Sequence, residues 1–274
     1  MGTVLVTGAS SGFGLLTAVE FARRGNVVFA SMRDPGKAGP LRAEAESAGV
    51  VVDVLPLDVT DRASVEKAVA TVIARTGRID VLVNNAAIFS VGPVEAHDDD
   101  ELLAAFETNV LGVIRVTRAA LPRMRAQERG TVVVVGSIAG RVAWPPVGVY
   151  AATKAALEAL SDTLYYELHP FRIRVVLVEP GHFATGLPAR LARRFTKDSP
   201  YRSIARAFAP FPLAGRNAGD PRRVAEVIVS AASADHPRRR YVVGDDAEYW
   251  CNLHKRLAEE EFERMVRSAL AFWD

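Results

Sequence analysis

Two kinds of hydrophobic pattern alternate along the chain. Short runs of β-branched and other apolar residues are apolar on both faces, which is typical of strands in a parallel sheet covered by helices. These runs are Thr3–Val6, Val27–Ala30, Val51–Leu55, Val81–Val83, Thr131–Val135, Arg174–Val178 and Tyr241–Val243. Longer segments between them carry apolar residues at helical spacing. They are Leu15–Arg24, Leu41–Ala48, Ala63–Arg75, Leu102–Ala126, Ala151–Leu168 and Glu248–Leu270.

The alternation predicts an α/β fold, a Rossmann-like doubly wound parallel sheet with helices on both faces. Right-handed crossovers would bring the carboxyl ends of the strands to one edge, where ligands bind in such sheets. No internal repeat or low-complexity linker interrupts the pattern. We therefore expect residues 1–274 to form a single domain, closed by a helix over residues 247–272.

Residues 182–220 depart from the pattern. They contain several prolines and aromatics, and a basic cluster at Arg190, Arg193 and Arg194. A long, weakly regular insertion in a compact domain is usually functional. We predict a substrate lid here, and the alternative is a surface excursion with a short helix.

Composition narrows the partners. Apolar residues make up 49% of the chain and charged residues 24%, and 34 basic against 32 acidic residues leave a net charge of +2. This balance gives no broad field to attract nucleic acid or acidic membranes. The lone Cys251 excludes an internal disulfide. The N-terminus makes a poor signal peptide, and no apolar run approaches the roughly 20 residues of a membrane span. We expect a soluble, cytoplasmic protein without a metal site.

A glycine-rich turn, Thr7–Gly14, joins the first strand to the first helix. Its glycines permit a tight turn and let the backbone approach a pyrophosphate, whose charge the helix N-terminus meets. The spacing G-x-x-x-G-x-G differs from the common G-x-G-x-x-G fingerprint. We assign dinucleotide contacts to Gly8, Ser10, Ser11, Gly12, Phe13 and Gly14, which makes the domain a dinucleotide-binding one.

The same turn contains a competing motif. Gly8–Gly12 matches G-x-S-x-G, the nucleophile elbow of α/β hydrolases, in which Ser10 would be the nucleophile. A nucleophile this close to the N-terminus leaves no upstream loop for the second oxyanion donor. The hydrolase is therefore the weaker alternative.

The end of the second strand bears on the choice of cofactor. An arginine there accommodates the 2′-phosphate of NADP, whereas an acidic residue binds the ribose hydroxyls of NAD. Arg33 and Asp34 are adjacent, and we place Arg33 at the strand end, which favours NADP and leaves NAD as the alternative. Asp58, after the third strand, is a candidate acceptor for the adenine amine. Asn84–Ala87 end the fourth strand in the same crevice.

Tyr150 and Lys154 supply candidate chemistry, because residues four apart share one helix face. A phenol has a pKa of about 10, and a nearby ammonium and an oxidised nicotinamide both favour phenolate. Tyr150 would then act as general acid and base, and Lys154 would also reach the nicotinamide ribose. Ser137, at the end of the fifth strand, could hold the substrate oxygen. Asn109 is a poor helix former inside a long helix and marks a distortion or a water serving Lys154.

Together these motifs, in this order, resemble the short-chain dehydrogenase/reductase family over roughly residues 3 to 245. The motifs are Thr7–Gly14, Asp58-Val59, Asn84–Ala87, Asn109, Ser137, Tyr150–Lys154 and Pro180-Gly181 followed by Thr185. The resemblance implies an Asn109–Ser137–Tyr150–Lys154 tetrad and hydride transfer between nicotinamide C4 and an alcohol or carbonyl carbon. It also implies cofactor contacts by Val59, Asn85, Ala86, Tyr150, Lys154, Pro180, Gly181 and Thr185, and a homodimer or homotetramer built partly on the helix of Tyr150.

Two departures from the family pattern stand out. Ala87 replaces a usual glycine and must tolerate a conformation that glycine often supplies, and Ser11 stands where many NADP-dependent members have a basic residue. Met32–Asp34 and Gly244–Glu248 look most like the hydroxysteroid and retinol dehydrogenase-like branch.

The candidate pocket walls are mostly apolar and aromatic. Substrate contacts are assigned to Val142, Trp144, His182, Phe183 and Leu187, with Val91, Val149, Phe195, Phe208 and Phe211 as further candidates. The sequence thus predicts an NADP-dependent oxidoreductase that interconverts a hydrophobic alcohol and its ketone or aldehyde. The alternative of a different class is a non-catalytic NADP-sensing regulator, which would be expected to lack the tyrosine or the lysine.

Overall fold

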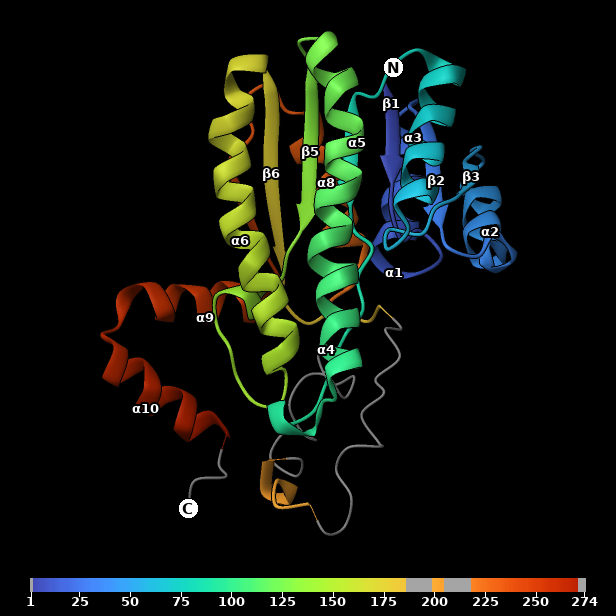
Figure 1. Cartoon of the computed structure of the whole chain (residues 1–274). Coiled ribbons are helices and arrows are strands. Elements are labelled where there is room, and N and C mark those ends of the chain that lie inside the picture. Colours follow the sequence, from blue (N-terminus) through green and yellow to red (C-terminus); the bar gives the residue numbers. More distant parts are fainter. Residues whose placement is uncertain (1, 186–198, 205–217, 271–274) are drawn as a thin grey trace.

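A seven-stranded parallel sheet forms the centre of the molecule (Figure 1). The computed structural model describes residues 2–185, 199–204 and 218–270. The strand order is β3-β2-β1-β4-β5-β6-β7, and all neighbouring strands run parallel. The strands are β1 Thr3–Val6, β2 Val27–Met32, β3 Asp53–Pro56, β4 Val81–Asn84, β5 Gly130–Val135, β6 Ile173–Pro180 and β7 Arg240–Val243. The predicted doubly wound sheet is confirmed.

Helices cover both faces of the sheet. They are α1 Gly12–Arg23, α2 Gly39–Ser47, α3 Arg62–Thr76, α5 Gly112–Ala126, α6 Gly148–Leu168 and α8 Arg222–Ser233. Helix α4, Asp99–Phe106, lies beyond the carboxyl ends of the strands and contacts α6 (Figure 1). One core packs the sheet against α1, α2 and α8, and the other packs it against α3, α5 and α6. Helix α8 has no counterpart among the predicted helices. Strand β3 begins at Asp53 and not at Val51, whose side chain is 87% exposed.

The long helix predicted over Leu102–Ala126 is interrupted. A π-helical turn, Glu107–Leu111, separates α4 from α5. Asn109 lies in this turn and is fully buried, so the distortion expected at this asparagine is present. Such insertions often occur at functional sites.

The prediction of one helix over residues 247–272 is wrong. Two helices, α9 Asp245–Arg256 and α10 Glu259–Leu270, meet at Leu257, whose backbone is extended. Three basic residues end α9 and three glutamates begin α10, the arrangement that the two helix dipoles favour. Both helices lie beyond the carboxyl ends of the strands, and α10 packs against α9 (Figure 1). In the part of the chain described, no helix has the length and apolarity to cross a membrane.

Candidate active site

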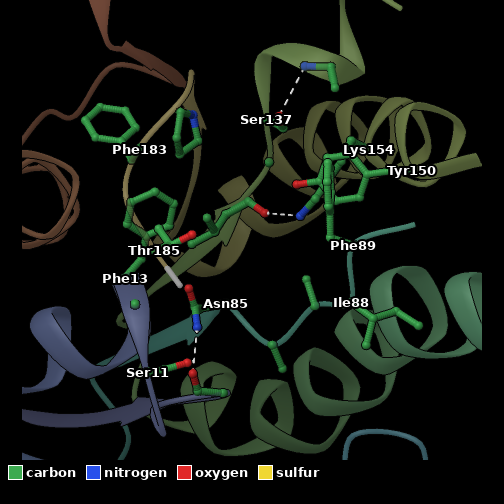
Figure 2. Close-up of a pocket in the computed structure, with 18 of the residues that line it drawn as sticks. Ser11, Phe13, Asn85, Ile88, Phe89, Ser137, Tyr150, Lys154, Phe183 and Thr185 are labelled. Carbon is green, nitrogen blue, oxygen red and sulfur yellow. Dashed lines mark hydrogen bonds between the residues drawn. The ribbon is translucent and has the colours of Figure 1, made fainter. Parts of the chain in front are cut away.

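A cavity of about 580 Å³ opens at the carboxyl ends of the strands (Figure 2). It begins at the glycine turn after β1 and at Arg33 after β2, and it ends at Trp144 and Trp250. Figure 2 shows Tyr150, Lys154 and Ser137 on one side of the cavity and Ser11, Phe13 and Asn85 on the other. The cavity therefore brings the predicted nucleotide turn and the predicted catalytic residues into one site.

The glycine turn is built by close backbone contacts. Gly8 and Gly12 have φ angles of +68° and +55°, which side chains other than glycine rarely adopt. A Cβ on Gly8 would lie 2.7 Å from Cα of Ala86, and a Cβ on Gly14 would lie 2.5 Å from the carbonyl oxygen of Gly8. Gly8 and Gly14 are therefore required by the packing of the turn against the loop that follows β4.

Hydrogen bonds hold the same two loops together. Nδ2 of Asn85 donates to the carbonyl oxygens of Thr7, at 2.9 Å, and Gly8, at 3.0 Å. The Thr7 hydroxyl accepts from the backbone N–H groups of Asn85 and Ala86 and donates to the Val83 carbonyl at 3.2 Å. The turn is thus fixed before any ligand arrives.

The turn offers N–H groups to an anion. The side chain of Ser11, just before α1, makes no capping hydrogen bond, so the first N–H groups of α1 are not capped by it. Ser10, Ser11, Gly12 and Phe13 all line the cavity. An anion such as a pyrophosphate suits this helix N-terminus. No hydrogen bond joins Ser10 to a described histidine, so the hydrolase alternative gains no support from the described residues.

Arg33 and Asp34 have different surroundings. Arg33 directly follows β2, is exposed and lines the cavity. Oδ1 of Asp34 accepts from the backbone N–H of Gly36 at 2.9 Å, within its own turn, and Asp34 does not line the cavity. Asp58 does line it, and its Oδ1 accepts from the N–H and hydroxyl of Thr60 at 2.9 and 2.7 Å.

Ala87 needs no special backbone conformation. Among the described residues, the only positive φ angles outside glycine belong to Glu128 and Arg172. The expectation that Ala87 must tolerate a glycine-like φ is therefore wrong. Ala87 lies in the extended loop after β4 and lines the cavity together with Asn85 and Ala86.

Tyr150 and Lys154 occupy successive turns near the start of α6. The Tyr150 hydroxyl is hydrogen-bonded to the side chain of Ser137, and the ring packs edge-on against Phe89 at 4.7 Å between centroids. Lys154 is 3% exposed, and its Nζ donates to the carbonyl oxygen of Val135 at 2.8 Å. The same Nζ lies 5.5 Å from the centroid of the Tyr150 ring. Three of the four proposed tetrad residues therefore meet at the end of β5.

Burial governs the proton affinities of this pair. It raises the pKa of Tyr150 to about 12, against the opposing hydrogen bond from Ser137, and lowers the pKa of Lys154 to about 8. The sequence predicted that the lysine would lower the phenol pKa. Instead, loss of hydration is the largest cause of the shift in the pKa of Tyr150, and the contribution that opposes it comes from Ser137. Tyr150 is consequently a protonated phenol at neutral pH.

Asn109 acts as a clamp between two segments. Its Oδ1 accepts from the backbone N–H of Ile88 at 2.8 Å, and its Nδ2 donates to the Ile88 carbonyl at 2.9 Å. Nδ2 also contacts the hydroxyl of Thr153 at 3.1 Å, which in turn donates to the Tyr150 carbonyl at 2.7 Å. The side chain thus links the loop after β4 to the helix of Tyr150 and does not itself reach Lys154.

Only some of the residues predicted to contact the substrate line the cavity. Trp144, His182 and Phe183 line the cavity, as do Pro180, Gly181 and Thr185 of the predicted cofactor set. Val142 does not, because its side chain is 1% exposed and packs against Ile138, Ala247 and Cys251. Val91 and Val149 are likewise buried away from the cavity. Leu187, Phe195, Phe208 and Phe211 lie outside the described residues.

Several further apolar residues line the cavity and were not predicted. They include Ile88, Phe89, Val147 and Trp250. Trp250 comes from α9, and its ring lies 5.6 Å from that of Trp144 between centroids. The pair of neighbouring aromatics Tyr249-Trp250 on the helix was the signal available in the sequence.

Comparisons with known proteins agree with one another. The family model for short chain dehydrogenase matches residues 2–194. The chain is 35% identical to 3-ketodihydrosphingosine reductase of Bacteroides thetaiotaomicron over 244 residues, covering 88% of this chain and 87% of that protein. It is 36% identical to estradiol 17-beta-dehydrogenase 1 of Rattus norvegicus over 255 residues, covering 87% and 72%.

Solved structures give the same result. A short-chain dehydrogenase from Streptomyces avermitilis matches with a TM-score of 0.82 and 36% identity, covering 97% of this chain and 98% of that one. A metagenomic short-chain oxidoreductase in complex with NADP matches with a TM-score of 0.71 and 25% identity, covering 88% and 96%.

Proposed function

The chain belongs to the short-chain dehydrogenase family, and on that premise we propose that it is an NADP-dependent oxidoreductase that interconverts a hydrophobic alcohol and its ketone or aldehyde. The observation that carries the proposal is the meeting of Tyr150, Lys154 and Ser137 in the cavity that also contains the glycine turn. Oxidoreductase chemistry itself follows from the family. The cofactor preference, the residue roles and the substrate class are the proposal.

Arg33 supports NADP. Its exposed guanidinium lines the cavity at the end of β2 and forms no ion pair with another described residue, whereas Asp34 is engaged with Gly36. A guanidinium binds phosphate oxygens in a planar, bidentate manner and stays charged at all relevant pH values. One structural relative was solved with NADP.

Tyr150 is the proposed proton donor. When bound, the nicotinamide supplies or accepts the hydride at its C4. With a pKa raised to about 12, the phenol is held in the form that protonates a carbonyl oxygen during reduction. The Ser137 hydroxyl, already bonded to Tyr150, would orient that oxygen. The buried Lys154 ammonium, next to the phenol ring, would favour the phenolate that each reduction leaves behind.

The substrate end supports a hydrophobic substrate. Phe89, Trp144, Val147 and Trp250 line it with apolar surface near Tyr150. Aromatic walls of this kind bury flat or long apolar molecules and leave few polar groups to pair. Two relatives carry names that refer to a ketosphingosine and to estradiol, both largely apolar.

Replacing Tyr150 tests the proposal. We expect Tyr150→Phe to reduce kcat for ketone reduction by about 10²- to 10⁴-fold, because the phenol supplies the proton in the transition state. NADPH affinity, measured by calorimetry, should remain close to that of the parent protein. Tyr166→Phe is the control, since Tyr166 lies on the same helix with its side chain 66% exposed.

The results for Tyr150→Phe and for the parent protein distinguish an oxidoreductase from a nucleotide sensor. Near-normal turnover by Tyr150→Phe would contradict the proposed mechanism. Tight NADPH binding by the parent protein without turnover of any ketone, aldehyde or alcohol in a broad panel would instead favour a nucleotide sensor.

A further inference from the structure

A buried carboxylate lies directly beneath the cavity. Glu179 is the residue of β6 before Pro180, and its side chain is fully buried. Its Oε2 accepts from Nη2 of Arg141 at 2.7 Å, and its Oε1 is paired with Nε of the same guanidinium. Burying a carboxylate without a partner is costly. Glu179 is therefore held with its charge matched by Arg141.

Arg141 connects this carboxylate to the Ser137 loop. Three residues separate Arg141 from Ser137, and they form the short helical turn Ile138–Gly140. The Ser137 hydroxyl accepts from the backbone N–H of Ala139 at 3.2 Å, within that turn. The position of the Ser137 hydroxyl is consequently tied to the turn that Arg141 ends.

The same guanidinium reaches the helix of Tyr150. Nε of Arg141 lies 3.9 Å from Oε2 of Glu158, which follows Lys154 by one turn of α6. The turn and the helix are also in direct contact, because a Cβ on Gly140 would lie 2.9 Å from the carbonyl carbon and oxygen of Lys154. A shift of Arg141 would therefore move the Ser137 loop along α6.

Strand β7 completes the cluster. Nη1 of Arg240 pairs with Glu158 and lies 3.8 Å from Oε1 of Glu179, and its Nη2 lies 2.6 Å from Oδ2 of Asp162. The Cys251 thiol of α9 faces Arg141 and Glu179, and the Asp246 carboxylate of the same helix acts on that thiol. We call Arg141, Glu158, Asp162, Glu179 and Arg240 the ion-pair cluster. It joins the Ser137 loop, α6, β6 and β7 below the site.

We propose that Glu179 is a positioning residue that, through Arg141, sets the placement of Ser137 relative to Tyr150. The inference rests on the proposed function, in which the Ser137–Tyr150 pair handles the substrate oxygen. Burial raises the pKa of Glu179, and the charge and hydrogen bond of Arg141 oppose this rise.

The test replaces Glu179 with its neutral isostere. In Glu179→Gln, Arg141 loses its buried counter-charge, and we expect kcat to fall about 10- to 100-fold, the effect of a small misplacement of reacting groups. NADPH affinity should not change. In alcohol oxidation, the rise of kcat/KM with pH should move to higher pH, because Ser137 no longer lowers the pKa of Tyr150.

Two further variants keep the test decisive. Arg141→Lys retains the positive charge but loses the planar guanidinium that contacts both Glu179 and Glu158. Because the Arg141 side chain is 29% exposed, this variant should fold even if Glu179→Gln does not. It should show the same losses. Glu44→Gln is the control, because Glu44 pairs with Arg222 at 2.8 Å and does not line the cavity.

Crystal structures give a readout that is independent of turnover. The proposal requires the Ser137–Tyr150 hydrogen bond to be lost or lengthened in Glu179→Gln or Arg141→Lys. A lowered Tm with an unchanged hydrogen bond, kcat and pH dependence would overturn it, since that is the result of a purely structural role. Absence of turnover in the parent protein would contradict the proposed function, and the crystal geometry would still test Glu179.

Discussion

The two ends of the cavity are built in different ways. At the nucleotide end, the walls are backbone segments and short polar side chains at the ends of adjacent strands, joined by hydrogen bonds such as those of Asn85 to Thr7 and Gly8. At the substrate end, the walls are large side chains from segments outside the sheet, such as Trp144 and Trp250. Strand pairing places the first set, and side-chain packing alone places the second.

The difference has a physical consequence. In a parallel sheet, the register of the strands fixes which residues arrive at the edge, as with Val6 beside Ala30 and Val83. A mutation at this end therefore meets backbone that has little room to move. At the other end, an aromatic side chain meets other side chains that can repack.

Crowding the glycine turn should have the largest effect. In Gly14→Ala, the new methyl group meets the Gly8 carbonyl oxygen and the Asn85 amide, so the turn must shift. We expect NADPH affinity to fall by about 100-fold, which corresponds to about 3 kcal/mol of overpacking. Calorimetric titration measures it.

The matched control is Gly39→Ala. A Cβ on Gly39 has nothing within 4 Å, and the residue begins a helix outside the cavity. Equal NADPH affinities for Gly14→Ala and the parent protein would contradict the view that backbone contacts determine the shape of the nucleotide end of the cavity.

Removing Arg33 should have the next largest effect and should discriminate between the cofactors. A hydrogen-bonded charge pair contributes about 1.5–3 kcal/mol, so Arg33→Ala should weaken NADPH binding by about 10- to 100-fold. NADH binding should be almost unchanged, because NADH has no 2′-phosphate. Arg118→Ala, an exposed arginine on α5, is the control. Equal losses of affinity for NADPH and NADH would show that Arg33 does not bind the 2′-phosphate.

Truncating Trp250 should have the smallest effect and should concern only the substrate end. In Trp250→Ala, a bulky apolar ketone loses one aromatic wall, worth about 1 kcal/mol, so its KM should rise about fivefold. KM for a small aliphatic ketone and NADPH affinity should stay the same. Tyr249→Ala is the comparison, since Tyr249 is 52% exposed and does not line the cavity. A similar KM change for small and bulky ketones would refute the assignment of Trp250 to the substrate wall.

The sequence predicted the sheet, and the place of the glycine turn in it, for the same reason. Alternating strand and helix patterns fix the topology, and Gly8 and Asn85 lie in connections whose place follows from that topology. Helical spacing placed Tyr150 and Lys154 on one helix face, and their assignment as a site depended on the glycine turn, Ser137 and Asn109 around them.

The errors concern features that depend on packing or on hydration. Val142 is next to cavity residues in the sequence but points into a cluster with Cys251. The helix break at Leu257 could not be predicted from a local signal, because no proline or glycine lies at this point of the sequence. The pKa of Tyr150 depends on how far the phenol is removed from water, which no local pattern reports. Trp250 reaches the cavity only because α9 folds back over the turn after Ser137.

The attachment of α9 has an evolutionary consequence. The helix rests on the turn after Ser137 through Ala247 and Cys251, and it sends Trp250 into the cavity without supplying any of the tetrad. A lineage could therefore exchange residues 245–270 and change this wall of the cavity while keeping the four residues of the proposed tetrad. In protein engineering, the same segment could be replaced as a unit, provided that Ala247 and Cys251, which pack against the turn after Ser137, are retained.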